Sequence, residues 1–304
     1  WLTCAILPLL AGDRLVGSCA ICYERYRTFS ADDRTVLTAA SGALAQAFSR
    51  AQLFDSRRRY LTELQHLMLP GRLPQPPGLQ VSARYRPGSA GLDVGGDWYD
   101  AIELRDGRVS LVIGDVQGHS ARAAAVMGQL RTVMRTQAAE GHGPEELMAR
   151  ANQTLCDLET ELFATCCMVE VDARRRTLRS VRAGHPCPLL CSVDGQVSEI
   201  AADGGIPLGF FPDEEYPVVT TELPGDCMLL LYSDGLVERP GTDYTDAVDQ
   251  LIEQLAWWAG TARAPGGGAE LDLDEVADRL VMPAATGPQH DDIALLLLRC
   301  TPTG

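Results

Sequence analysis

Val112-Ile-Gly-Asp-Val-Gln-Gly-His119 is the stretch of sequence that decides the fold. Its first residues continue an apolar run typical of a buried strand, and Asp115 stands where that strand ends. The turn signal Asp106-Gly107 lies just upstream and predicts a hairpin between strands over 97–104 and 108–115. Asp115 is therefore a carboxylate at the edge of a buried sheet, which makes it a candidate functional group.

Three further sites repeat this arrangement. They are Asp97 in Gly95-Gly-Asp-Trp-Tyr-Asp100, Asp234 in Leu231-Tyr-Ser-Asp-Gly235, and the pair Asp291 and Asp292 in Gln289-His-Asp-Asp-Ile-Ala294. One such Asp would be unremarkable in a turn, but several unpaired carboxylates at buried strand ends require a counter-ion. The chain has no Lys and no Arg beside these residues. Since Mg²⁺ and Mn²⁺ prefer oxygen ligands, the set predicts a divalent-cation centre.

The composition excludes several classes of protein. The chain has 304 residues, 46 % hydrophobic and 22 % charged, which is typical of a globular protein of about two domains. No apolar run approaches the ~18 residues of a membrane-spanning helix. The net charge is −15, made up of +3 in residues 1–75 and −18 in residues 76–304, and it argues against general binding of nucleic acid. Because the chain begins at Trp1, we expect it to be a fragment.

The ten cysteines are too sparse for a secreted disulfide scaffold. Several of them lie in apolar, strand-like runs, which predicts buried, reduced thiols in a cytoplasmic protein. Cys19-Ala-Ile-Cys22 has zinc-knuckle spacing, but residues three apart on a strand point to opposite faces. Reduced thiols are therefore favoured over a zinc site.

The first 75 residues have a pattern of their own. Apolar alternation predicts strands over 3–10 and 15–23, and Ser30-Ala-Asp-Asp33 is typical of a capping box that opens a helix ending before Pro70. A seven-residue recurrence on this helix indicates either a parallel homodimer or a helix packed on its own domain; it comprises Ala47, Phe54, Leu61 and Met68. The order of elements over residues 1–50 resembles the C-terminal half of a GAF sensor domain.

Residues 51–75 form a helical, Pro-rich linker, and the pattern then changes. Strands are predicted over 79–85, 163–171, 177–183, 187–193, 218–223, 227–232 and 293–298. Helices are predicted after Ser120, from Pro144 to about Cys156, and over 246–258 and 271–280, the last two separated by a Gly266-Gly-Gly268 loop. Many antiparallel strands with two groups of helices indicate an α+β fold, a layered β-sandwich flanked by helices.

Six motifs occur in the order found in one known family. They are Gly95-Gly-Asp-Trp-Tyr-Asp100, Gly114-Asp-Val-Gln-Gly-His119, Ala183-Gly-His-Pro186, Gly205-Ile-Pro-Leu-Gly209, Tyr232-Ser-Asp-Gly235 and His290-Asp-Asp-Ile293. Together they resemble the PPM-type metal-dependent protein serine/threonine phosphatases of the bacterial SpoIIE/RsbU branch. The resemblance covers residues 76–300 and implies the PPM phosphatase fold, with two cations at one end of the sandwich.

The resemblance also implies a ligand set for two Mn²⁺ or Mg²⁺ ions. Asp115 would bridge both ions, and the carbonyl of Val116 would bind one of them. Asp97 and Asp234 would supply the other main carboxylates. In the pair that begins the last strand, Asp291 matches the final ligand better than Asp292.

Two histidines are candidates for protonating the leaving group, since histidine titrates near neutral pH. His119 stands four residues after Asp115, whereas the eukaryotic branch has a histidine two residues after the bridging Asp, where this chain has Gln117. The family's general-acid role therefore does not transfer directly, and His119 stays a candidate beside a loop-structuring role. His185 is the weaker candidate because Gly184-His-Pro186 is typical of a turn.

The implied activity is hydrolysis of phosphoserine or phosphothreonine by a metal-activated water. The branch implies a phosphorylated anti-sigma factor antagonist of the STAS type as substrate, within a partner-switching pathway. A non-catalytic signalling module that retains the fold is the main alternative. A nucleotide phosphoester hydrolase is a third, disfavoured by the acidic charge and by the lack of a P-loop.

Overall fold

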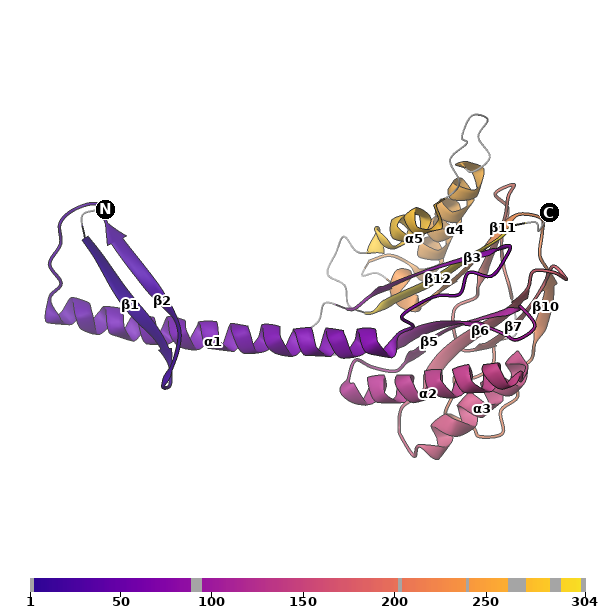
Figure 1. The fold of residues 1–304 in the computed structure, drawn as a ribbon, viewed down its shortest axis with the longest axis horizontal. Helices are drawn as coiled ribbons and strands as arrows, with labels where there is room; N and C mark the ends of the chain where they lie inside the picture. Colours follow the sequence, from indigo (N-terminus) through magenta and orange to yellow (C-terminus); the bar gives the residue numbers. More distant parts are fainter. Residues whose placement is uncertain are drawn as a thin grey trace. The chain divides into compact units, whose positions relative to one another are not determined.

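The computed structural model describes residues 3–88, 95–201, 204–238, 241–261, 272–284 and 291–301. The chain divides into two compact units, Trp1–Leu61 and Thr62–Gly304. The boundary falls within one long helix, α1 (Ala31–Met68), so that its last turns belong to the second unit (Figure 1).

The first unit contains one β-hairpin and most of α1. Strands β1 (Thr3–Ala11) and β2 (Arg14–Tyr23) pair in antiparallel register around a turn at Gly12 and Asp13. The predicted capping box is confirmed, because Ser30 Oγ accepts from the Asp33 N–H at 3.1 Å while the Ser30 N–H donates to Asp33 Oδ2 at 2.9 Å. These elements agree with the predicted order, and the GAF resemblance stays a prediction.

The second unit is built on two antiparallel sheets of five strands each. The strands of the first sheet are β4 (Asp97–Glu103), β5 (Val109–Val116), β6 (Ala164–Asp172), β7 (Thr177–Ala183) and β10 (Val219–Glu222), in the order β10-β7-β6-β5-β4. Those of the second sheet are β3 (Leu79–Arg86), β8 (Leu189–Ser192), β9 (Val197–Glu199), β11 (Cys227–Tyr232) and β12 (Ile293–Cys300), in the order β3-β12-β11-β8-β9.

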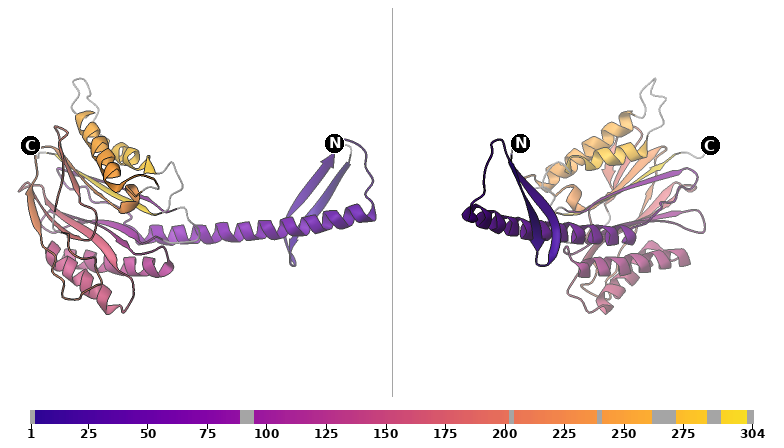
Figure 2. Two further views of the ribbon diagram at one scale, coloured as in Figure 1. Left: turned by 180° about the vertical axis from the view of Figure 1, so that it is seen from behind. Right: turned by 60° about the vertical axis from the view of Figure 1, so that its left-hand side comes forward.

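Each sheet has a pair of helices on its outer face (Figure 2). Helices α2 (Ala121–Glu140) and α3 (Pro144–Asp157) pack on the first sheet, and α4 (Tyr244–Thr261) and α5 (Leu273–Val281) pack on the second. Three apolar cores lie between the four layers, one between the sheets and one beneath each helix pair. The predicted layered sandwich flanked by helices is confirmed.

Burial on both faces explains why β11 and β12 are continuous apolar runs without polar alternation. Leu296 faces the core between the sheets, whereas its neighbours Leu295 and Leu297 face the core beneath α4 and α5. A strand covered on both faces has no solvent side on which to place polar residues. The two strands are therefore firmly held, which fixes the positions of the acidic residues at their ends.

The predicted elements differ from the structure at a few places. The strand predicted over 187–193 is the shorter β8, and Pro188, which has no N–H to donate, lies just outside it. The three-residue β9 was not predicted, because so short a strand shows no periodicity. The Gly266-Gly-Gly268 loop lies outside the described residues.

All ten cysteines are free thiols. Across the described ranges, no helix combines the length and the hydropathy needed to cross a membrane.

Candidate metal centre

The hairpin of β4 and β5 places two of the predicted acidic residues opposite each other. Asp97 and Asp115 are partners in the strand register, and Asp97 is only 1 % exposed. The next pair in the register is Trp98 and Gly114, and a side chain at Gly114 would overlap the Trp98 indole. The Trp98 ring therefore fills the space beside Gly114, which lets the hairpin close with both carboxylates at its open end.

The ends of β11 and β12 bring the other two acidic sites together. Ser233 follows β11, and its Oγ accepts from the Ala294 N–H at 2.9 Å, which ties it to the start of β12. Asp234 then begins a short 3-10 helix, η1 (Asp234–Leu236). Asp291 and Asp292 precede β12 directly. The pairing of β11 with β12 thus brings Asp234 and the Asp291–Asp292 pair together at one end of the sandwich, although they are far apart in the sequence.

Three glycines make room for this acidic cluster. A Cβ at Gly95 would overlap the Asp292 carboxylate, and one at Gly96 would overlap the Val116 carbonyl and lie 2.9 Å from Asp115 Oδ1. A Cβ at Gly235 would overlap the Asp292 carbonyl. The motif glycines are therefore required for close approach of the backbone to the acidic groups.

Burial and neighbouring acidic charges raise the pKa values of the clustered carboxylates. Burial is the largest cause at each of them. With the nearby charge of Asp234, burial raises the pKa of Asp115 to about 7, and with the charge of Asp291 it raises the pKa of Asp234 to about 6. Burial and Asp115 raise the pKa of Asp97 well above its usual value. Crowded, desolvated carboxylates of this kind favour a cationic partner.

The residues present fit a hard divalent cation. Asp97 Oδ2 and Asp234 Oδ1 are buried without a hydrogen-bond partner, and the donors around them are carboxylates and the Val116 carbonyl. Mg²⁺ and Mn²⁺ take such oxygen donors and usually retain waters as further ligands. Within the described ranges, no three His, Cys, Asp or Glu side chains are already drawn together as a ligand set. The residues therefore fit a divalent cation in the type of their donor atoms and in their negative charge.

The two members of the Asp291–Asp292 pair differ in environment. The Asp291 side chain is 43 % exposed, and its charge raises the pKa values of both Asp115 and Asp234. Asp292 is only 3 % exposed, and both of its carboxylate oxygens accept hydrogen bonds, from the Gly88 N–H at 2.7 Å and the Tyr85 hydroxyl at 2.9 Å. One Asp291 oxygen, Oδ1, accepts from the Asp292 N–H at 2.8 Å, whereas both Asp292 oxygens are engaged by groups of other segments.

The two histidine candidates also differ. His119 is 48 % exposed, with Nε2 at 3.5 Å from Asp291 Oδ1. His185 is 1 % exposed, its Nδ1 pairs with the Thr165 hydroxyl at 2.8 Å, and burial lowers its pKa to about 3. A buried imidazole with so low a pKa is not an imidazolium near neutral pH and is therefore a poor general acid, so of the two candidates His119 is the one that stays.

Sequence reasoning missed the polar groups that hydrogen-bond to residues beside the proposed ligands. Buried Asp100, in the same motif as Asp97, accepts from Arg131 Nε at 3.0 Å and from Arg135 Nη1 at 2.6 Å. Tyr85 holds Asp292, as described above. The two arginines are four residues apart on one face of α2, which is a signal that could have been found; Tyr85 offers no comparable signal.

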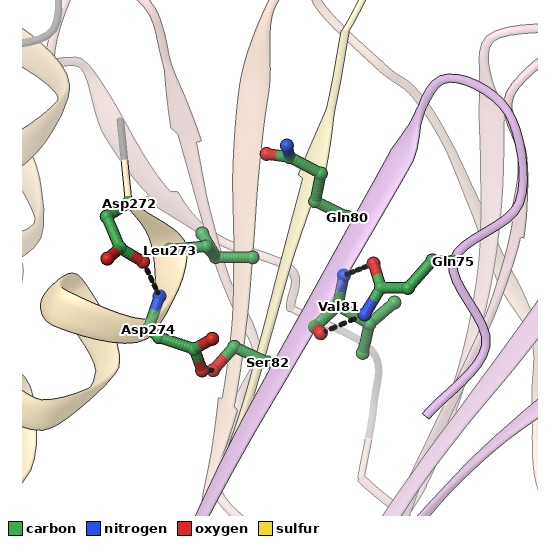
Figure 3. Close-up of a pocket in the computed structure, with 7 residues that line it drawn as sticks. All are labelled: Gln75, Gln80, Val81, Ser82, Asp272, Leu273 and Asp274. Atoms are coloured by element: carbon green, nitrogen blue, oxygen red, sulfur yellow. Dashed lines mark hydrogen bonds between the residues drawn. The ribbon is translucent and has the colours of Figure 1, made fainter. Parts of the chain in front are cut away.

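Away from the acidic cluster, a pocket between β3 and α5 has a volume of about 410 Å³ and is drawn in Figure 3. Gln75 pairs both ways with the Val81 backbone at its wall, and Ser82 donates to Asp274 Oδ1 at 2.7 Å. None of the acidic residues of the cluster lines it. We therefore assign it no part in the metal centre.

Comparison with known proteins gives a family. Residues 105–301 match the family described as Stage II sporulation protein E (SpoIIE). Phosphoserine phosphatase RsbP of Bacillus subtilis (strain 168) is 27 % identical over 171 residues, covering 55 % of this chain and 41 % of RsbP. The chain thus spans less than half the length of that relative.

Similar solved structures agree with the family match. The RsbU and RsbW domains of Rv1364c from Mycobacterium tuberculosis give a TM-score of 0.68 at 30 % identity, covering 78 % of this chain and 64 % of that chain. The PP2C phosphatase domain of SpoIIE from Bacillus subtilis gives 0.61 at 21 % identity, covering 74 % and 64 %. The second likeness shows the fold alone. With the family match extending over more than half of its length, this chain belongs to the SpoIIE family and has the PP2C phosphatase fold.

Proposed function

We propose that this chain is a metal-dependent phosphatase of phosphoserine or phosphothreonine in proteins. The observation that carries the proposal is the acidic cluster, in which burial and neighbouring acidic charges raise the pKa values of Asp97, Asp115 and Asp234. Asp97 Oδ2 and Asp234 Oδ1 are also buried without a partner. The likeness to the phosphoserine phosphatase RsbP supports the same reaction. We further propose Mn²⁺ or Mg²⁺ as the cofactor, in a pair of ions.

In this proposal the chain's own residues hold the cations and orient the substrate. The charge of Asp115 raises the pKa of Asp97, and the charge of Asp234 raises the pKa of Asp115, so Asp115 interacts with both of the other carboxylates. It would therefore contact both ions, while the Val116 carbonyl and Asp291 would complete the ligand set. When bound, the cations supply a water of lowered pKa and neutralise charge on the phosphoryl oxygens. No side-chain nucleophile is required for this reaction.

His119 is the proposed proton donor to the leaving serine oxygen. Its imidazole is half exposed, so a protein substrate can reach it from solvent. The Asp291 Oδ1 atom lies 3.5 Å from His119 Nε2, which places the imidazole beside one of the proposed ligands. A donor in this place would stabilise the leaving alkoxide as the P–O bond breaks.

The proposed substrate is a phosphorylated anti-sigma factor antagonist of the STAS type. This choice follows from the motif resemblance, and the names of two relatives, RsbP and RsbU, each described as a phosphoserine phosphatase, support the phosphoserine part of it. We also propose a homodimer and the division into a GAF-like part over residues 1–50, a linker over 51–75 and the phosphatase domain over 76–300.

The test is release of phosphate from a phosphoserine STAS protein, from a phosphopeptide and from nucleotides, each with Mn²⁺ or with a chelator. We expect metal-dependent hydrolysis of the first substrate, weaker hydrolysis of the peptide and none of the nucleotides. Asp213→Asn, a change at an exposed residue in the loop before β10, serves as the matched control for Asp→Asn changes in the cluster. Activity that persists after complete chelation refutes the proposal. If neither the phosphoserine STAS protein nor the phosphopeptide is hydrolysed, a non-catalytic module is favoured.

A further inference from the structure

Asp292 is a buried carboxylate inside the acidic cluster that the proposed ligand set does not use. The charge of Asp292 acts directly on Asp97, whose pKa it helps to raise. Both of its oxygens are engaged by hydrogen bonds from the rest of the chain, one from the Gly88 N–H and one from the Tyr85 hydroxyl. A carboxylate engaged in this way is poorly placed to take a cation but well placed to fix the groups around it.

The surroundings of Asp292 connect three segments that carry proposed ligands. Its carboxylate occupies the place that a side chain at Gly95 would need, two residues before Asp97. Its carbonyl occupies the place of a side chain at Gly235, next to Asp234. Asp291 precedes it in the chain. A shift of Asp292 would therefore change the distances between the segments that carry Asp97, Asp234 and Asp291.

The hydroxyl that holds Asp292 is itself held from α1. Tyr85 lies on β3, and its hydroxyl donates to Asp292 Oδ2 at 2.9 Å while accepting from Gln65 Nε2. A hydroxyl has one proton to donate and lone pairs to accept, so both roles are satisfied together. Burial and the charge of Asp292 raise the pKa of Tyr85, which keeps the proton in place.

Gln65 is fixed in turn by the way α1 ends. Gln65 is 3 % exposed, and one helical turn later the Met68 carbonyl accepts from Arg131 Nη1 at 2.6 Å. The same guanidinium donates from Nε to buried Asp100. The last turn of α1 is therefore anchored to α2 and β4, and Gln65 presents its amide to Tyr85 from an anchored position.

We propose that Tyr85 is a positioning residue of the metal centre, which holds Asp292 and thereby the spacing of Asp97, Asp234 and Asp291, and that Gln65 acts through it. The inference rests on the proposed function, because it assumes that these aspartates bind cations. Tyr85 touches neither the cations nor the substrate in this scheme. Loss of its hydroxyl should therefore weaken cation binding without abolishing it.

Tyr85→Phe tests the hydroxyl while it keeps the ring. We expect the apparent dissociation constant for Mn²⁺, measured by calorimetric titration of the metal-free chain, to rise about tenfold to a hundredfold, as for other groups that orient metal ligands. Turnover should fall at limiting Mn²⁺ and recover at saturating Mn²⁺. Tyr216→Phe is the control, since it also removes a tyrosine hydroxyl, one that is buried without a partner, so that its removal should leave Mn²⁺ affinity unchanged.

Gln65→Leu tests the link to α1. We expect a smaller loss of Mn²⁺ affinity, about threefold to tenfold, and no further loss when Gln65→Leu is added to Tyr85→Phe, because both act through one hydroxyl. Mn²⁺ affinity in Tyr85→Phe within twofold of the parent overturns the inference. Additive losses in the double variant overturn the part assigned to Gln65.

These outcomes separate the inference from the proposed function. A parent chain that binds Mn²⁺ but hydrolyses no phosphoprotein refutes the function, while the Mn²⁺ affinities still decide the role of Tyr85. A parent chain that is active, with unchanged Mn²⁺ affinity in Tyr85→Phe, refutes the inference alone. A parent chain that binds no divalent cation refutes both.

Discussion

Replacing Asp115 by Asn should stabilise the metal-free protein while it removes the proposed activity. Asp115 lies opposite Asp97 across the β4–β5 hairpin, and its charge is disfavoured by burial and by the neighbouring Asp234 and Asp291. An amide has nearly the same shape and carries no charge. The substitution therefore removes an electrostatic penalty that the folded chain carries when no cation is bound.

The pKa of Asp115 sets the size and the pH range of the effect. A rise from 3.8 to about 7 corresponds to at most about 4 kcal/mol of destabilisation above pH 7, at ~1.4 kcal/mol per pH unit. Between these two pH values the folded state binds more protons than the unfolded state, so the metal-free parent loses stability as the pH rises. For a domain of this size each kcal/mol moves the Tm by roughly 2–4 °C.

The assay is thermal unfolding of chelator-treated parent and Asp115→Asn chains at pH 5, 6, 7 and 8. We expect the variant to have the higher Tm at pH 8, by several degrees, and the difference to fall to less than half of that value at pH 5, since it disappears only below pH 3.8. Mn²⁺ should narrow the difference at a hundredfold excess over the dissociation constant, which stabilises the parent by about 2.7 kcal/mol, and should close it at about a thousandfold excess, where the gain is about 4.1 kcal/mol. Asp213→Asn should change none of these values. A variant that is less stable than the parent at pH 8 without metal, or a gain that does not depend on pH, refutes the reasoning.

Three further outcomes are expected. Asp234→Asn should weaken Mn²⁺ binding at least tenfold in a calorimetric titration, because a neutral amide replaces a charged oxygen ligand whose Oδ1 has no other partner; unchanged affinity contradicts the ligand set. Cys167→Ser should keep phosphate release within a few-fold of the parent, because burial raises the pKa of this thiol to about 12 and leaves no thiolate to act as a nucleophile; a complete loss in a folded variant contradicts this. Phe54→Asp combined with Leu61→Asp should shift sedimentation from dimer to monomer by placing charge in the proposed helix seam, and a monomeric parent at high concentration rules out the dimer.

The sequence was sufficient to place one half of the metal centre. The Asp106-Gly107 turn sets the register of the β4–β5 hairpin, and that register alone puts Asp97 opposite Asp115. The apolar runs that end at Tyr232 and begin at Ile293 likewise identified Asp234 and Asp291 as residues at strand ends. Local signals succeed here because hairpin pairing and strand burial leave their mark on adjacent residues.

The supporting groups could not be predicted in the same way. Tyr85 and Asp292 are 207 residues apart, and their contact depends on β3 pairing with β12 at the edge of a sheet whose strand order does not follow the chain. Apolar periodicity assigns a residue to a buried face but does not identify the strand that faces it. The resemblance predicted the fold and the main ligands, but it gave no role to Gln65 or Tyr85.

The arrangement of the centre makes metal binding part of the stability of this domain. Four layers with three apolar cores hold the strand ends so firmly that the carboxylates cannot move apart to relieve their repulsion. The electrostatic penalty therefore stays in the folded state until a cation offsets it, and a cation that binds only the folded state raises its stability in proportion to the logarithm of its concentration. A flexible acidic loop would relax instead and would bind cations weakly. The apolar, doubly buried β11 and β12 thus account for the raised pKa values of the cluster and would account for the affinity for a divalent cation that we propose.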